Sequence, residues 1–146
     1  MERTLARDAV NKVGGEVNLY GWVVARRDHG GVTFFDLSDR SGIVQVVAKS
    51  GAEDLRSQDV VRVSGKVKER PQGAENKEIE TGKIEIDAVE IEVISKAETL
   101  PFDMGGKDLD LQLPTLLDFR SLTLRHPKVR DIFRVQASLL EGFRKV

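Results

Sequence analysis

The sequence predicts a mainly β protein in which five strands close a small barrel, with one helix before the barrel and a hinge and a second helix after it. Two observations support this fold class. Strand-like runs of alternating apolar residues are separated by glycine-bearing turns, and the first run contains Gly21, a position typical of a barrel corner. The change in character after the fifth run divides the chain into a barrel over residues 1–95, a hinge over 96–126 and a helical segment over 127–146.

Composition limits the kinds of protein that this chain can be. Its 146 residues suit one domain with an appendage, and 23 basic against 24 acidic side chains leave a net charge of −1. A protein that binds nucleic acid through charge alone is usually strongly basic, so binding here should depend on a few placed contacts. There are no cysteines, and His29 and His126 make no recognisable metal motif. No apolar run approaches the roughly 20 residues of a membrane span, so a cytoplasmic protein is expected.

The chain opens with a short predicted helix over residues 4–13. Two glycines end this helix, and we expect it to cover one end of the sheet. The apolar residues on its predicted buried side are Leu5, Ala9, Val10 and Val13.

Five strands are predicted from the alternation of apolar and polar residues. Tight turns at residues 29–31 and 39–42 join the first three strands into a meander. In the fifth strand the apolar residues change from even to odd positions, so an extra residue, a β-bulge, is expected near Asp87–Val89. The predicted strands are Val17–Arg27, Val32–Leu37, Ile43–Val47, Asp59–Arg70 and Lys83–Ile94.

Five strands with a bent first strand fit the five-stranded Greek-key OB-fold barrel best. That fold binds oligonucleotides across strands 2 and 3 and across the loops that join strands 1–2 and 4–5. An SH3-like barrel fits the strand count as well, but it leaves the long loop between the fourth and fifth strands without a role.

Pairing of Ser38 with Ile43 across the second turn predicts the register of the second and third strands. Phe34 and Gln45 then lie on the same side of the sheet, as diagonal neighbours. The opposite side is apolar and suits a core. The pairs on the polar side are Asp36–Gln45 and Phe34–Val47, and the core side carries Phe35, Leu37, Val44 and Val46.

Arg27 joins the polar side through the first turn, across which we expect it to pair with Val32. An aromatic ring, an amide and a guanidinium would then share one outward face of the sheet. This combination suits an unpaired nucleotide, because a ring can stack on a base, an amide can donate and accept on a base edge, and an arginine can bind phosphate. The alternative is a half-exposed phenylalanine among ordinary polar neighbours.

The stretch from Gly21 to Val47 carries a family resemblance. Its sequence is GWVVARRDHGGVTFFDLSDRSGIVQVV, and the similarity continues through VSGKV, TGKIEI, LPFD and RSLTLRHPKVRDIF. Over nearly its whole length the chain resembles the anticodon-binding barrel of bacterial-type aspartyl-tRNA synthetase, followed by the entry to the catalytic domain. Lysyl- and asparaginyl-tRNA synthetases share this barrel but match less well.

The resemblance implies a tRNA-binding role for particular residues. Phe34 matches the ring on which the middle uridine of the anticodon stacks, and Gln45 matches the amide that reads the edge of that uridine. Arg27 matches an arginine of the same face. The remaining matches are Asp28, which shapes the adjoining turn, and Arg70 and Asn76, at polar positions near the first anticodon base.

Two further positions bear on which tRNA is bound. His29 and Gly73 resemble the pattern of family members that charge both aspartate and asparagine tRNAs. The two anticodons differ only in their last base, and a histidine with a side-chain-free glycine near that base could relax its reading. The alternative is that Gly73 only permits a turn and His29 is a solvated loop residue.

The resemblance implies a parent ligase that uses ATP and Mg²⁺ and forms a homodimer. The sequence contains neither the arginine–glutamate pair nor the glycine-rich strand of the class II catalytic signatures. We therefore expect no cofactor in this chain and no aminoacylation by it alone. From Asp108 onward the sequence DLDLQLPTLLDF also departs from the more charged segment that is usual in bacterial members.

The segment after the barrel is predicted to be a hinge with glycines at Gly105 and Gly106, a short helical piece over Leu116–Leu122, and a helix opened by Pro127. One side of that last helix is apolar, and we expect a missing domain to cover it rather than the barrel or another chain. Two other functions stay open, a free-standing single-strand-binding OB protein and a protein-interaction module that uses this helix. The apolar side carries Val129, Ile132, Phe133, Leu139, Leu140 and Phe143.

Overall fold

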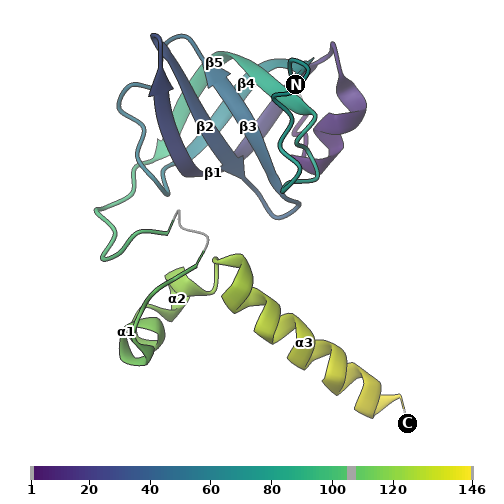
Figure 1. Cartoon of the computed structure of the whole chain (residues 1–146), viewed down its shortest axis with the longest axis vertical. Helices are drawn as coiled ribbons and strands as arrows, with labels where there is room; N and C mark the ends of the chain where they lie inside the picture. Colours follow the sequence, from purple (N-terminus) through teal and green to yellow (C-terminus); the bar gives the residue numbers. More distant parts are fainter. Residues whose placement is uncertain (1, 105–107, 146) are drawn as a thin grey trace. The chain divides into compact units, whose positions relative to one another are not determined.

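The computed structural model describes residues 2–104 and 108–145. Contacts within the chain divide it into two compact units, residues 1–100 and 101–146 (Figure 1). The predicted hinge glycines Gly105 and Gly106 lie outside the described residues. The predicted boundaries at residues 95 and 126 stay predictions.

The first unit is a closed five-stranded barrel, which confirms the predicted OB fold. Neighbouring strands follow the order β1-β2-β3-β5-β4 around the barrel, and β4 also pairs with β1. All pairings are antiparallel except that of β3 with β5, which is parallel. The strands are β1 (Glu16–His29), β2 (Val32–Ser38), β3 (Ile43–Ala48), β4 (Val60–Glu69) and β5 (Ile84–Ser95).

The barrel interior is filled by the inward-facing half of each alternating strand. Phe35 is the largest of these side chains, and it is surrounded by leucine, isoleucine and valine side chains that are almost completely buried. Two glycines let strands cross closely. A Cβ atom on Gly21 would lie 2.3 Å from the Ser38 carbonyl oxygen, and one on Gly65 would lie 2.5 Å from the Asp87 carbonyl oxygen. The interior glycine of the first strand is therefore a requirement of the barrel.

The predicted bulge in β5 is confirmed. Gly65 pairs with Ala88 and Ser64 pairs with Glu90, so Val89 is the extra residue and is exposed. This insertion moves the following apolar residues back to the inner side of the sheet. Two further register shifts, at Val24 in β1 and at Ile94 in β5, were not predicted from the sequence.

The predicted register across the second turn is confirmed, and the register across the first turn is wrong by two residues. Arg27 pairs with Phe34, and His29 pairs with Val32 across a turn of two glycines with φ of +58° and +79°. Two residues with positive φ allow a tighter hairpin than the sequence analysis assumed. Because side chains alternate with a period of two, this shift keeps Arg27 on the side of Phe34.

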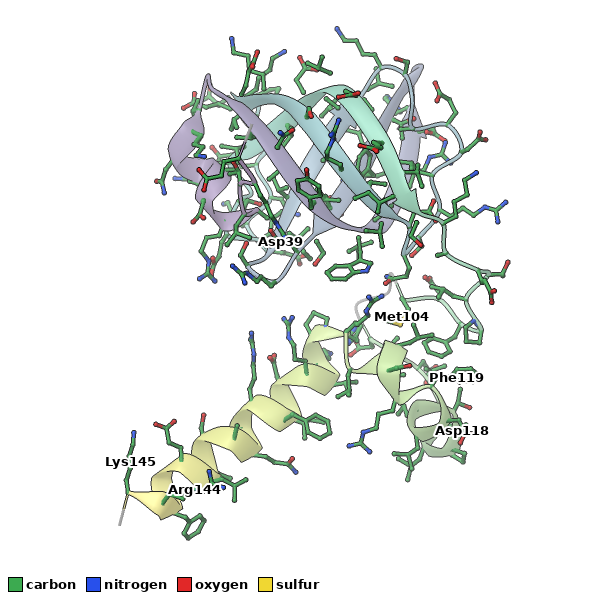
Figure 2. The ribbon with its side chains drawn as sticks, turned by 180° about the vertical axis from the view of Figure 1, so that it is seen from behind. Asp39, Met104, Asp118, Phe119, Arg144 and Lys145 are labelled. Atoms are coloured by element: carbon green, nitrogen blue, oxygen red, sulfur yellow. The ribbon has the colours of Figure 1, made fainter. Side chains whose placement is uncertain are left out.

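The predicted N-terminal helix is the 3-10 helix η1 (Arg7–Lys12), which contacts β1 and β4. Its predicted buried side was right for Ala9, which is buried, and for Leu5, which is half-buried, but wrong for Val10 and Val13, which are exposed; Ala6 is buried instead. A 3-10 helix repeats every three residues, which places Ala6 and Ala9 on one side. The Asp39 carboxylate, labelled in Figure 2, accepts a hydrogen bond from the Ala6 backbone N–H at 2.9 Å and attaches this segment to the β2–β3 turn.

The second unit is helical. The predicted piece over Leu116–Leu122 is split between two short helices, and the predicted start of the last helix at Pro127 is confirmed. Phe102 packs edge-on against Phe119, with ring centroids 5.7 Å apart. None of the helices in the described part of the chain is long and apolar enough to cross a membrane. The helices are α1 (Leu113–Asp118), α2 (Arg120–Thr123) and α3 (Pro127–Arg144).

Candidate nucleic-acid interface

The outward side of β1, β2 and β3 carries a compact set of side chains that we call the recognition face, defined by Arg27, Phe34 and Gln45. Arg27 lies opposite Phe34, and Phe34 lies opposite Val47, so one row across the sheet consists of Arg27, Phe34 and Val47. The adjacent row contains Asp36, which lies opposite Gln45. The trio expected from the sequence is brought together.

Phe34 is half-buried on this face, whereas the neighbouring Phe35 is only 1% exposed and lies in the core. The two consecutive rings therefore have different surroundings because side chains alternate across a strand. A ring that is open on one side and supported by its strand neighbours is suited to stacking against a flat, apolar partner such as a nucleobase.

Gln45 is 7% exposed, and both ends of its amide are hydrogen-bonded. Arg27 Nη2 donates to Gln45 Oε1 at 3.1 Å, and Gln45 Nε2 donates to Glu85 Oε2 at 3.2 Å. A guanidinium can only donate and a carboxylate can only accept, so these two partners determine which end of the amide is oxygen and which is nitrogen. One lone pair on Oε1 and one hydrogen on Nε2 are left for another molecule.

Four charged groups surround this amide and balance each other, with Arg27 and Arg70 against Asp36 and Glu85. Burial raises the pKa of the Asp36 carboxyl, and the nearby Arg27 and Arg70 guanidinia partly offset that rise. Burial lowers the pKa of the Arg70 guanidinium, although the Glu85 and Asp36 carboxylates act in the opposite direction. The recognition face is thus a neutral, partly desolvated network and not a basic patch.

Arg70 is held in place mainly by the backbone. Its Nε donates to the Ile84 carbonyl oxygen at 2.9 Å, and its backbone N–H donates to the Lys83 carbonyl oxygen at 2.9 Å. The Arg70 Nη2 atom is buried without a hydrogen-bond partner among the described residues. A buried cationic donor of this kind favours an incoming acceptor, such as a carbonyl or phosphate oxygen.

Asp28 and His29 lie near the first turn but on opposite sides of the sheet. The Asp28 carboxylate accepts a hydrogen bond from the Thr33 hydroxyl at 2.7 Å and pairs with Arg26 at 2.8 Å. It therefore ties the two arms of the hairpin together on the side away from Phe34. His29 is the exposed last residue of β1 and shares the side of Arg27.

Gly73 and Asn76 lie in the loop between β4 and β5. Gly73 has a φ of +86°, and the Ala74 N–H donates to the Pro71 carbonyl oxygen at 2.9 Å, so Gly73 occupies a turn position that favours glycine. The Asn76 side-chain oxygen accepts from the Glu78 backbone N–H at 2.9 Å. Both residues thus have a structural role, and their contact with tRNA stays a prediction.

The sequence analysis missed Glu85 and Asp36 as members of the network. Asp36 could have been found, since the predicted register already placed it opposite Gln45. Glu85 could not be found in this way, because the parallel pairing of β3 with β5 brings it to Gln45 only when the barrel closes. In the residues that the structure describes, no cluster of three or more histidine, cysteine or acidic side chains could hold a metal ion.

The family model for OB-fold nucleic acid binding domains of the tRNA anticodon type matches residues 17–94, more than half of the chain. The chain belongs to this family. The match covers all of the recognition face and the β4–β5 loop, and so the anticodon-binding domain accounts for the first unit.

Sequence relatives agree with the resemblance to aspartyl-tRNA synthetase. The chain is 46% identical to Aspartate–tRNA(Asp/Asn) ligase of Thermobifida fusca (strain YX) over 123 residues, which is 83% of this chain and 21% of the relative. It is 45% identical to the ligase of the same name from Acidothermus cellulolyticus (strain ATCC 43068 / DSM 8971 / 11B) over 138 residues, 91% of this chain and 23% of the relative. The chain therefore spans less than a quarter of the length of these relatives.

Solved structures of related enzymes have the same fold. An aspartyl tRNA synthetase from Entamoeba histolytica superposes with a TM-score of 0.85 at 20% identity, over 99% of this chain and 37% of that protein. An asparaginyl-tRNA synthetase from Pyrococcus horikoshii, complexed with asparaginyl-adenylate, superposes with a TM-score of 0.78 at 27% identity, over 99% of this chain and 34% of that protein. The likeness to the first of these structures shows a shared fold.

Proposed function

We propose that the anticodon-binding domain reads the anticodon of aspartate and asparagine tRNAs as the recognition module of an aspartate–tRNA ligase. The observation that carries this proposal is the Gln45 amide, held between Arg27 and Glu85 beside the half-open ring of Phe34. The sequence relatives are named for both tRNAs, which supports the same pair of substrates for this chain.

The chemistry of the amide supports uridine as the middle base. The free lone pair of Gln45 Oε1 can accept from an N–H, and the free hydrogen of Nε2 can donate to a carbonyl. The Watson–Crick edge of uracil offers this pair in its N3–H and O4 atoms. Stacking on Phe34 would contribute about 1–3 kcal/mol, and the hydrogen-bonding pattern would reject cytosine, whose edge has donor and acceptor exchanged.

The charge balance of the recognition face supports reading by placed contacts. Two guanidinium and two carboxylate groups surround Gln45, and the whole chain carries a net charge of −1. A domain of this kind binds one unpaired base well without attracting nucleic acid in general. A free-standing single-strand-binding protein would depend more on excess positive charge.

A titration with anticodon stem-loops tests the proposal. Fluorescently labelled aspartate and asparagine stem-loops should bind the chain with similar affinity, and a stem-loop with cytidine at the middle position should bind about fivefold more weakly or worse, since each mismatched contact costs about 1–3 kcal/mol. The same titrations at two salt concentrations separate the alternatives. Binding that ignores the middle base and falls steeply with salt would identify a general single-strand binder instead.

We assign the relaxed choice between the two tRNAs to His29 and Gly73. His29 is exposed on the same side as Arg27, at the tip of the β1–β2 hairpin, where it can reach a base next to the one on Phe34. His29→Leu should separate the affinities for the aspartate and asparagine stem-loops, while His29→Gln should change them less. Equal affinities for both stem-loops in the leucine variant would leave His29 as a solvated turn residue.

The parent ligase is proposed to join aspartate to tRNA with ATP and Mg²⁺ and to act as a homodimer. Among the described residues, no three histidine, cysteine, aspartate or glutamate side chains are grouped so that they could hold a metal ion. We propose that this chain contributes the placement of the tRNA through its anticodon. An ATP–pyrophosphate exchange assay on this chain should give no signal.

A further inference from the structure

The TGKIEI motif of residues 81–86 contains two residues that the proposed function does not yet use. Glu85 in this motif orients Gln45, and Ile84 and Ile86 fill the core. Thr81 and Gly82 precede them at the end of the β4–β5 loop, which carries Gly73 and Asn76. A polar residue and a glycine at the base of a long loop call for a physical explanation.

Thr81 attaches the loop to the strand that carries Gln45. Its side chain is 1% exposed, and its hydroxyl donates to the backbone carbonyl oxygen of Ile43, the first residue of β3. A buried hydroxyl without a hydrogen bond costs free energy, so this contact favours the position of the loop end against β3. The exposed ion pair of Glu80 with Arg7, at 2.8 Å, lies next to it in sequence.

Gly82 lets the loop close on itself. A Cβ atom at this position would lie 1.7 Å from the Asn76 carbonyl oxygen and 3.0 Å from the Ile79 carbonyl oxygen. The Asn76 N–H donates to the Gly82 carbonyl oxygen at 3.0 Å, and the Gly82 N–H donates to the Ile79 carbonyl oxygen at 3.0 Å. Any residue with a Cβ atom at this position would force the backbone segments of residues 76 and 82 apart.

The Asn76 side chain completes this closure, because its oxygen accepts from the Glu78 backbone N–H. Long surface loops are usually mobile and lose entropy when they order on a ligand. The hydrogen bonds within residues 76–82, together with the attachment of Thr81 to β3, restrain this half of the loop.

We infer that Thr81 and Gly82 are positioning residues that preorganise the β4–β5 loop for the anticodon and couple it to the recognition face through β3. This inference rests on the proposed function. It assigns no nucleic-acid contact to either residue, since Thr81 is buried against β3 and Gly82 is buried under Asn76. Their effect on affinity acts through the fixed position of Asn76 and of the turn at Gly73.

The test compares Thr81→Val and Gly82→Ala with matched controls on the full 146-residue chain. Thr81→Val keeps the shape of the side chain and removes the donor. The controls are Thr99→Val, at an exposed position outside the barrel strands, and Gly42→Ala, where an added Cβ would meet nothing within 4 Å. Hydrogen exchange measured by NMR at the backbone amides of residues 76 and 82 reports on the loop, and stem-loop titration reports on binding.

In the two loop variants we expect these amides to exchange about tenfold faster or more, with the amides of the barrel strands still protected, and stem-loop affinity to fall about tenfold. The controls should match the wild type in both measurements. Faster loop exchange with unchanged affinity would overturn the positioning role while leaving the proposed function standing. Unchanged loop exchange in both variants would overturn the preorganisation itself.

The two proposals fail in different ways. If the wild-type chain binds no stem-loop, the proposed function is overturned, and the positioning role is overturned with it whatever the exchange data show. If the wild type binds and discriminates at the middle base, only the comparison between loop variants and controls decides the inference. Thr81→Val serves as the decisive variant should Gly82→Ala fail to fold.

Discussion

Gln45 shows how single residues define the recognition face. Its amide is oriented by one neighbour that can only donate, Arg27, and one that can only accept, Glu85. Orientation by charge in this way fixes the pattern that an incoming base must match, so specificity at this position follows from the identity of the two neighbours.

Replacement of Phe34 tests the stacking surface. Phe34→Ala should weaken binding of the aspartate stem-loop by about 1–3 kcal/mol, because a base then has no ring to stack on. Phe34→Tyr keeps the ring and should stay close to the wild type. Isothermal titration of both variants checks this, and equal losses in both would show that the ring is not a stacking partner.

Gln45→Glu tests the reading of the base edge at constant size. The new carboxylate can accept but not donate, so it matches neither the Glu85 carboxylate nor the edge of uracil, whereas it can accept from the N4 amino group of cytosine. The preference for uridine over cytidine at the middle position should therefore shrink or reverse. Paired titrations with the two stem-loops measure this ratio, and an unchanged preference would place the reading elsewhere.

The raised pKa of the Asp36 carboxyl should make the free energy of unfolding depend on pH. Burial holds the pKa of its carboxyl above the ordinary value of 3.8 in the folded state. A raised carboxyl pKa contributes stability that is fully present below the unfolded-state pKa and is lost as pH rises through the folded-state pKa. Asp36→Asn removes this contribution to the pH dependence.

The free energy of unfolding of Asp36→Asn, relative to the wild type, should therefore rise as pH increases from about 4. Urea unfolding at a series of pH values between 3 and 7 measures the difference. Ser38→Ala, on the same side of β2, serves as the control and should show a difference independent of pH. A constant offset for Asp36→Asn would contradict the burial of this carboxyl.

At the scale of elements, the barrel depends on places where two strands come unusually close. Gly21 faces the Ser38 carbonyl oxygen and Gly65 faces the Asp87 carbonyl oxygen, each within a distance that excludes a Cβ atom. The bulge at Val89 adds a further local bend in β5. These crossings let five short strands close around a small core.

Gly21→Ala tests this dependence. The added methyl group would be forced against the backbone of β2, and we expect a loss of about 1–3 kcal/mol in the free energy of unfolding, as for overpacked cores. Gly42→Ala adds the same group in open space and should stay within about 0.5 kcal/mol of the wild type. Guanidinium unfolding measures both, and equal stability of the two variants would show that β1 can move away from β2.

At the scale of the whole molecule, the two units have different sources of stability. Every residue of the buried core cluster lies between Ala6 and Ile91, inside the first unit. The second unit instead exposes large apolar side chains along α3, among them Leu139, Leu140 and Phe143. The first unit has its own buried core, whereas the last helix has an exposed apolar side, so we expect only the first unit to be stable by itself.

A chain cut after Leu100 tests this difference. Residues 1–100 should unfold cooperatively, with a free energy of unfolding within about 0.5 kcal/mol of that measured for the barrel in the full chain. Stem-loop affinity should also be kept. Intrinsic fluorescence of Trp22 follows the barrel in both chains, and loss of a cooperative transition in the shorter chain would show that residues 101–146 belong to its core.

The sequence by itself determined the strand set, the OB-type barrel, the bulge in β5 and the side of the sheet on which Phe34, Gln45 and Arg27 lie. These properties follow from the alternation of side chains with a period of two. An error of two residues in the register across the first turn does not disturb this alternation. The size of the first turn was not determined, because it depends on whether both glycines adopt positive φ.

Only the tertiary structure decided the surroundings of these side chains. Glu85 reaches Gln45, Arg70 reaches the charged network and Thr81 reaches Ile43 because the parallel pairing of β3 with β5 closes the barrel. Contacts between residues so far apart in sequence leave no periodic signal in the chain. They exist only once closure has brought distant strands side by side.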